Sequence, residues 1–192
     1  MSGALDQLRD EHQVILQVVQ RMEDVIGERT ARPSRDMFLR AAVEFVRVYA
    51  DANHHGKEEQ ALFDMMRRSP RLAGMASLLA EEHVDGRAQI GALEQALDAH
   101  QDDAVQRAVL GYVSYIRAHI AKEDGMIFEA AEDELTPEDE AELERAFAYV
   151  EASALGAGGL KSALAPLNAA RPAGTVAIDV KNRARQPLQT QS

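Results

Sequence analysis

The 192-residue chain contains no cysteine and no tryptophan, and aromatic residues make up only 5% of it. Without cysteine it cannot form disulfides, iron–sulfur clusters or thiolate zinc sites, so any metal must be held by nitrogen and oxygen atoms. No apolar run approaches the roughly 18 residues that a membrane-spanning helix needs. The N-terminal segment carries Asp6, Asp10 and Glu11 and has no apolar stretch typical of a secretory signal. We therefore expect a cytoplasmic protein with no membrane partner.

Positive charge is also scarce. The chain has 32 acidic against 21 basic residues, which gives a formal net charge of −11. Such a chain repels the phosphate backbone of nucleic acids, so we expect no nucleic-acid partner. Its length suits one compact domain rather than two.

Apolar residues recur at steps of three and four, the pattern of amphipathic helices, in the four segments 5–26, 38–66, 72–97 and 105–127. Because the connections are short, we predict an all-α fold, an up-down-up-down four-helix bundle. Thr136 and Pro137 read as the start of an extra C-terminal helix that extends to about residue 155. Residues 1–155 would then form the domain. Residues 156–192, rich in Gly, Ala and Pro and basic in charge, are expected to be a disordered or weakly docked tail.

The two halves of the chain repeat one another. The segment Leu8-Arg9-Asp10-Glu11-His12 aligns with Leu79-Ala80-Glu81-Glu82-His83. The segment that starts His54-His55-Gly56-Lys57-Glu58-Glu59 aligns with the one that starts His119-Ile120-Ala121-Lys122-Glu123-Asp124. Each half therefore supplies one helix with a histidine and one helix with a histidine and a carboxylate, and a pseudo-symmetric bundle would bring these groups together.

The spacing His-x-x-x-Glu places two side chains one above the other on a helix, about 6 Å apart along its axis, so both can reach one metal ion. On a helical wheel His12 and His83 fall within the apolar stripes of their helices. His119 and Glu123 do the same in the fourth helix. These four residues are candidate ligands.

The second helix offers two pairs with this spacing, His54 with Glu58 and His55 with Glu59. The internal repeat favours the first pair. The wheel favours the second, because His55 and Glu59 lie on the flank of the apolar stripe while the other pair points away from it. We prefer His55 and Glu59 as metal ligands on the wheel, although a local helical bulge would reverse the assignment.

Four buried imidazoles and two buried carboxylates without a partner would cost several kcal/mol for each charged group, and a bound metal removes that conflict. Six such ligands are too many for one tetrahedral zinc ion. Shared between two ions, they suit non-haem iron, so we predict two iron ions in an oxo- or hydroxo-bridged di-iron centre. Manganese and zinc remain compatible with the ligand types. An open position would be left for a small diatomic gas or peroxide.

These motifs resemble the hemerythrin-like HHE cation-binding family over about residues 4–130. The resemblance implies a four-helix bundle with a carboxylate-bridged di-iron centre. Oxygen-carrying hemerythrins have His-x-x-x-x-Asp in the fourth helix, a spacing that Asp124 shares, so the resemblance makes Asp124 an alternative to Glu123. They also have a His-x-x-x-His pair in the third helix, but Leu79 and Arg87 stand one turn either side of His83 here. A fifth histidine is therefore expected to be missing, and the site is expected to react more and bind oxygen less reversibly.

Three further residues are candidates for a supporting role. Tyr115 and Tyr112 lie one and two turns before His119 on the same face and can donate a hydrogen bond near the metals, and Glu82 beside His83 is a spare ligand. The first functional hypothesis is a di-iron protein that binds dioxygen or nitric oxide for sensing, storage or delivery. The alternatives are an oxidant-handling enzyme with catalase- or peroxidase-like activity and an interaction module that the metal only stabilises.

Overall fold

The computed structural model describes residues 3–27 and 30–179, and all regular structure in these ranges is helical. The prediction of an all-α fold is therefore confirmed. The first helix is α1 (Ala4–Gly27). A second, unbroken helix runs through α2 (Arg32–Phe45), η1 (Val46–His55), η2 (Glu58–Leu62) and α3 (Phe63–Met66). The third is α4 (Ala73–Asp98), and the fourth runs through α5 (Asp102–Lys122), η3 (Glu123–Ile127) and α6 (Phe128–Glu132).

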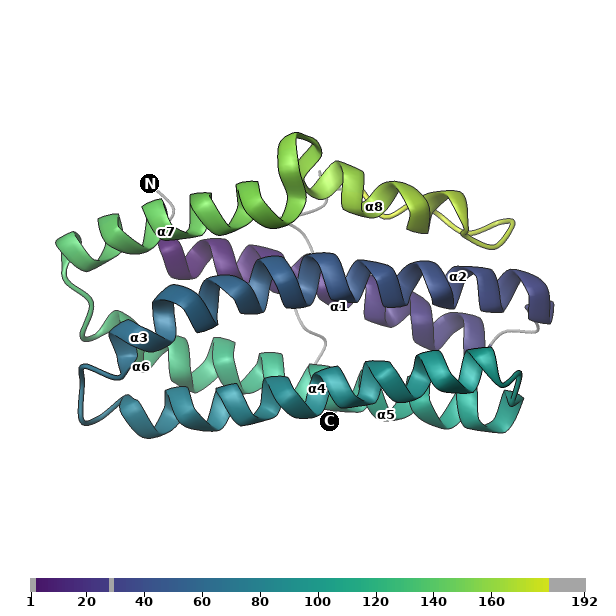
Figure 1. Cartoon of the computed structure of the whole chain (residues 1–192), viewed down its shortest axis with the longest axis horizontal. Coiled ribbons are helices and arrows are strands. Elements are labelled where there is room, and N and C mark those ends of the chain that lie inside the picture. The colour runs from purple at the N-terminus through teal and green to yellow at the C-terminus, as the bar shows by residue number, and fades with distance from the viewer. Residues whose placement is uncertain (1–2, 28–29, 180–192) are drawn as a thin grey trace.

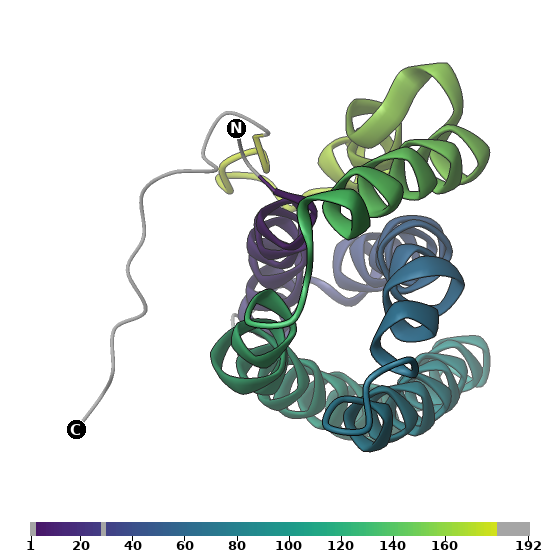
Figure 2. The same cartoon turned by 90° about the vertical axis from the view of Figure 1, so that its left-hand side faces the viewer.

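These four long helices form a bundle whose members lie side by side along its length (Figure 1). Seen end-on, they occupy the four corners of the bundle, and α7 (Pro137–Leu155) lies outside it, across α1 and the second long helix (Figure 2). The geometry of the bundle thus leaves an interior that all four long helices border.

The interior is apolar toward both ends and polar between them. One hydrophobic cluster includes Val18, Leu39 and Leu93, and the other includes Leu8, Phe63 and Phe128. Along every long helix, buried histidines or carboxylates fall between the residues of these two clusters. Apolar burial at both ends stabilises the fold and thereby holds a central polar layer away from water.

Two of the long helices are wound more widely than an α-helix at the level of this layer. The segments η1, η2 and η3 are π-helical, with hydrogen bonds from residue i to i+5. This winding changes which side chains face the interior, because residues five apart come closer to one face than they do in an α-helix. Segments of this kind are frequent at functional sites.

The helix α7 begins as the sequence predicts. The Thr136 hydroxyl accepts a hydrogen bond from the Asp139 amide, and the Asp139 carboxylate accepts one from the Thr136 amide, which forms a capping box with Pro137 at the first helical position. The apolar face of α7, with Leu143, Phe147 and Val150, is buried.

The chain beyond residue 155 differs from the expected tail. After a short turn η4 (Gly156–Gly158) it forms α8 (Gly159–Ala169), which buries Leu160, Leu164 and Leu167 against the bundle. These leucines recur at helical spacing, so burial of their side chains offsets the ordering cost that the small residues alone could not. The rest of the predicted tail, residues 180–192, lies outside the described residues. Within the described ranges, every helix is too short or too polar to cross a bilayer.

Candidate metal centre

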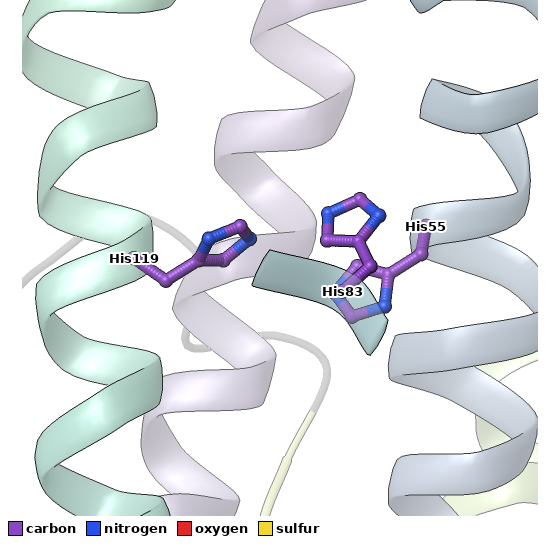
Figure 3. Close-up of side chains that lie close together, drawn as sticks. All are labelled: His55, His83 and His119. Atoms are coloured by element: carbon purple, nitrogen blue, oxygen red, sulfur yellow. The ribbon is translucent and has the colours of Figure 1, made fainter. Parts of the chain in front are cut away.

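Five histidines from the four long helices face the central layer and form two groups. We call His12 and His54 the two-histidine group, and His55, His83 and His119 the three-histidine group. All five are buried. In the three-histidine group, one ring nitrogen of each residue lies within 4.8 Å of one from each of the others. Figure 3 shows these three side chains converging on a common space.

Two carboxylates lie between the groups, and each directs one oxygen toward either side. For Glu58, Oε1 lies 3.7 Å from Nε2 of His54 and Oε2 lies 3.4 Å from Nε2 of His83. For Glu123, Oε2 lies 3.2 Å from Nε2 of His12 and Oε1 lies 3.2 Å from Nε2 of His119. Both carboxylates are thus placed to bridge two cations, one held by each histidine group.

The atoms that face this space have no hydrogen-bond partner within the described chain. They are the Nε2 atoms of four of the histidines and both oxygens of the two carboxylates, namely His12, His54, His83, His119, Glu58 and Glu123. Each such buried atom costs about 1–3 kcal/mol when it is left unsatisfied. Nitrogen and carboxylate donors converging in this way fit two transition-metal ions, which would take up their lone pairs.

The opposite ring nitrogen of four histidines contacts a second carboxylate. Nδ1 lies 2.7 Å from Asp124 in His12, 3.0 Å from Glu11 in His54, 2.8 Å from Glu59 in His83 and 2.8 Å from Glu82 in His119. Metal-binding histidines are typically fixed in this way, since the carboxylate sets the tautomer and makes the ligating nitrogen more basic.

The two central carboxylates differ in their readiness to ionise. Burial raises the pKa of Glu58 well above its usual value, and the negative charge of Glu123 adds to that effect. Burial also acts to raise the pKa of Glu123, but interactions with His119 and His12 outweigh it and hold that pKa well below its usual value. In the metal-free protein, Glu58 therefore holds a proton more readily than Glu123 does.

The histidines also differ in the direction of their pKa shifts. Burial acts to lower the pKa of His12, but the carboxylates of Asp124 and Glu123 outweigh it and raise the pKa to about 9. Burial lowers the pKa of His54 to about 4, assisted by the charge of His12, and lowers that of His55 to about 3. Any cation entering the site must therefore displace protons from some ligands and finds others already neutral.

The prediction that His55 and Glu59 are the ligands of the second helix needs correction: the carboxylate that lies with the histidines is Glu58 and not Glu59. Glu58 is fully buried between the histidine groups, whereas the Glu59 side chain is 33% exposed and accepts a hydrogen bond from Arg87 as well as contacting His83. The π-helical winding turns both His54 and His55 inward, so the α-helical wheel gave the wrong phase here.

The expectation that a fifth histidine is missing also needs correction. His55 takes that place from the second helix, and its ring stacks on that of His83. The internal repeat has Ile120 at the corresponding position, so His55 is what makes the two histidine groups unequal.

The remaining candidates lie around the site rather than in it. Tyr115 stacks on the His119 ring, with centroids 5.8 Å apart, and its hydroxyl donates to the backbone carbonyl of Glu82. Tyr112 is buried, with its ring centroid 6.3 Å from that of Tyr115. Glu82 itself contacts the Nδ1 of His119 and the ammonium of Lys122, so it supports a histidine instead of facing the central space.

The sequence interpretation missed Glu11 and Lys57, which belong to the contacts around His54. Lys57 donates to Glu11, and Glu11 contacts His54. The internal repeat contained the signal, because Lys57 aligns with Lys122 and Glu11 aligns with Glu82. Lys122 contacts Glu82 in the second half just as Lys57 contacts Glu11 in the first.

A helical bundle with buried histidines and carboxylates able to hold metal defines the general class of this chain. The family model described as the hemerythrin HHE cation binding domain matches residues 3–131, which is more than half of the 192-residue chain. The chain therefore belongs to the hemerythrin HHE cation-binding family, as the sequence motifs indicated. No curated protein and no solved structure matches it.

Proposed function

We propose that this protein is a non-haem di-iron protein that binds dioxygen or nitric oxide for sensing, storage or delivery. The observation that carries the proposal is the position of Glu58 and Glu123, each of which directs one oxygen toward each histidine group. That arrangement suits two ions that share both carboxylates, in an up-down-up-down bundle of the four long helices.

The ligand sets that we assign are unequal. One ion would be held by His12 and His54, the other by His55, His83 and His119, and both by the two carboxylates. Two ferrous ions, when bound, would supply the electrons and the open coordination position that a diatomic gas requires. Because the two-histidine group offers one nitrogen fewer, a cation held there would leave more room for an added ligand.

The side chains around that position restrict what reaches it. The Phe128 ring lies parallel to that of His12, with centroids 5.7 Å apart, and the layer is buried between the two hydrophobic clusters. Apolar walls favour a small uncharged ligand over an ion. Metals other than iron are compatible with the same donors, which makes metal identity the first measurement.

The test is metal analysis of the purified protein followed by anaerobic reduction and exposure to dioxygen or nitric oxide. We expect two iron ions per chain and a saturable optical change with each gas that reverses when the gas is removed. Tight binding of a single ion, or no optical response, would overturn the proposal.

A second candidate is an oxidant-handling enzyme, favoured by the stacking of Tyr115 on His119. It predicts sustained peroxide turnover that a Glu123→Ala variant lacks, at a rate above that of free iron. An interaction module would instead show a lower melting temperature after chelation and no response to gas or peroxide.

A further inference from the structure

A chain of charged contacts connects His54 to the helix α7, which lies beyond the matched domain. Nδ1 of His54 lies 3.0 Å from Oε2 of Glu11, and the ammonium of Lys57 donates to the other oxygen of Glu11. The same ammonium donates to Oε2 of Glu151 at 2.9 Å. Glu151 belongs to α7, whereas the family match ends at residue 131.

Lys57 and Glu11, in the middle of this series of contacts, are shielded from water. The Lys57 side chain is fully buried, and Glu11 is nearly so, whereas Glu151 remains 43% exposed. A buried ammonium is stable only where carboxylates surround it. Lys57 therefore depends on both of its partners, and each partner influences the other through it. Hydrogen bonds of the Gln7 amide to Glu11 and Glu151 connect them a second time.

The other half of the site has the same series of charged contacts, but without a residue that corresponds to Glu151. Lys122 contacts Glu82, and Glu82 contacts Nδ1 of His119. Lys122 is 31% exposed, and no carboxylate from α7 contacts it within the described chain. Among the described residues, charged contacts thus tie the His54 side of the centre to α7 and leave the His119 side without such a tie.

Packing brings α7 close enough for this contact. At Gly56, a Cβ atom would lie 3.2 Å from Cγ1 of Val150, so the absence of a side chain lets α7 approach the second long helix. Phe147 and Val150 are buried on that face of α7. Figure 2 shows α7 lying across this side of the bundle. Glu151 follows directly after Val150, which places its carboxylate beside Lys57.

We propose that Glu151 is a positioning residue of the metal centre, which acts through Lys57 and Glu11 to hold the His54 imidazole and so strengthens cation binding by the two-histidine group. The proposal rests on the proposed function. Without the charge of Glu151, Lys57 has a single anionic partner. Glu11 is then drawn toward Lys57 and away from His54, and the surroundings of the cation lose one negative charge.

The experiment compares Glu151→Gln with Glu151→Asp, which keeps the charge, and with Glu144→Gln, which removes an exposed carboxylate from the same helix. Anaerobic Fe(II) titrations against a competing chelator give the affinities of both ions. We expect Glu151→Gln to weaken one of the two ions about threefold to tenfold, because loss of a directly contacting carboxylate costs about ten- to hundredfold. Glu151→Asp should recover part of that loss, and Glu144→Gln should match the wild type.

A second measurement uses metal-free protein. Nitrogen-15 spectra of the histidine rings, assigned with a His54→Gln variant, should show a shift of the His54 nitrogens in Glu151→Gln and none in Glu144→Gln. If the wild type binds no iron, the proposed function fails, and this spectrum still decides the positioning role. If Glu151→Gln matches Glu144→Gln in both measurements, or weakens both ions equally, the positioning role is overturned while the di-iron function stands.

Discussion

The imidazole rings of His55 and His83 stack almost in parallel, with centroids 3.8 Å apart and an angle of 14° between their planes. Burial lowers the pKa of His55 to about 3, so this ring is neutral at physiological pH. A neutral ring beside His83 adds a nitrogen donor to the three-histidine group. The pseudo-symmetric position holds Ile120, so this stack exists on one side of the centre only.

Replacing His55 with the residue of the other half, His55→Ile, should weaken one ion selectively. We expect the affinity of the three-histidine group for Fe(II) to fall at least tenfold, while the metal-free protein keeps its stability because a buried polar atom is removed. Iron content after gel filtration measures the effect, and Ile120→Val is the control. Retention of two tightly bound ions would rule out His55 as a ligand.

The neighbours Glu58 and Glu59 should respond differently to the same substitution. Glu58→Gln should prevent the binding of at least one ion, because the amide nitrogen cannot act as a ligand on one side. Glu59→Gln alters a partner of His83 and Arg87 that lies outside the central layer, so two ions should still bind at saturating iron, about ten- to hundredfold more weakly. Equilibrium titration with Fe(II) distinguishes the two variants. Equal behaviour would contradict the assignment of Glu58 to the centre.

The metal-free protein should lose stability as the pH rises from about 6.5 to about 9. The folded state raises the pKa of His12 from 6.5 to about 9, so its contribution is complete below the unfolded value and disappears as the pH passes the folded one. This shift corresponds to about 3 kcal/mol. Urea unfolding of chelated protein at both pH values measures it.

The pH dependence of metal binding tests the same protonation of His12 independently. Binding must displace the proton of His12, so the affinity for Fe(II) should increase with pH over the same interval and protons should be released into a weak buffer at pH 7. Metal-free stability that is constant between pH 6.5 and 9 would contradict the assigned protonation states.

Two glycines of α4 should respond in opposite directions to alanine. At Gly86 a Cβ would lie 3.0 Å from Cε1 of Tyr115, so Gly86→Ala should displace the ring that stacks on His119 and destabilise the protein by about 1–2 kcal/mol. Gly91 has nothing within 4 Å, and Gly91→Ala should stabilise the helix by about 0.5–1 kcal/mol. Thermal unfolding measures both, and similar changes in the two variants would contradict the packing of Tyr115.

The helical fold and much of the site's placement followed from the sequence where the winding is regular. His12 and His83 lie within α-helices and His119 near the end of one, so a wheel of 3.6 residues per turn placed them on the interior face. The wheel failed between Val46 and Leu62, where η1 and η2 have a different periodicity. Side-chain patterns carry no direct signal for that change, although the internal repeat pointed to Glu58.

The C-terminal region shows a second limit of prediction from the sequence. Small residues after Gly156 suggested too little apolar surface to fold, but three leucines at helical spacing are enough when an existing bundle receives them. The contact of Glu151 with Lys57 was equally inaccessible, because residues far apart in the chain meet only after α7 has packed.

The π-helical stretch before Gly56 lets two adjacent residues, His54 and His55, both donate to the interior. A regular helix offers such donors only at intervals of three or four, so a fifth imidazole would otherwise require another turn or another helix. A local change of helical pitch can therefore change the number of donor side chains that a helix directs into the bundle, without lengthening the helix. Surveys that search for ligands at fixed intervals will undercount them in chains of this kind.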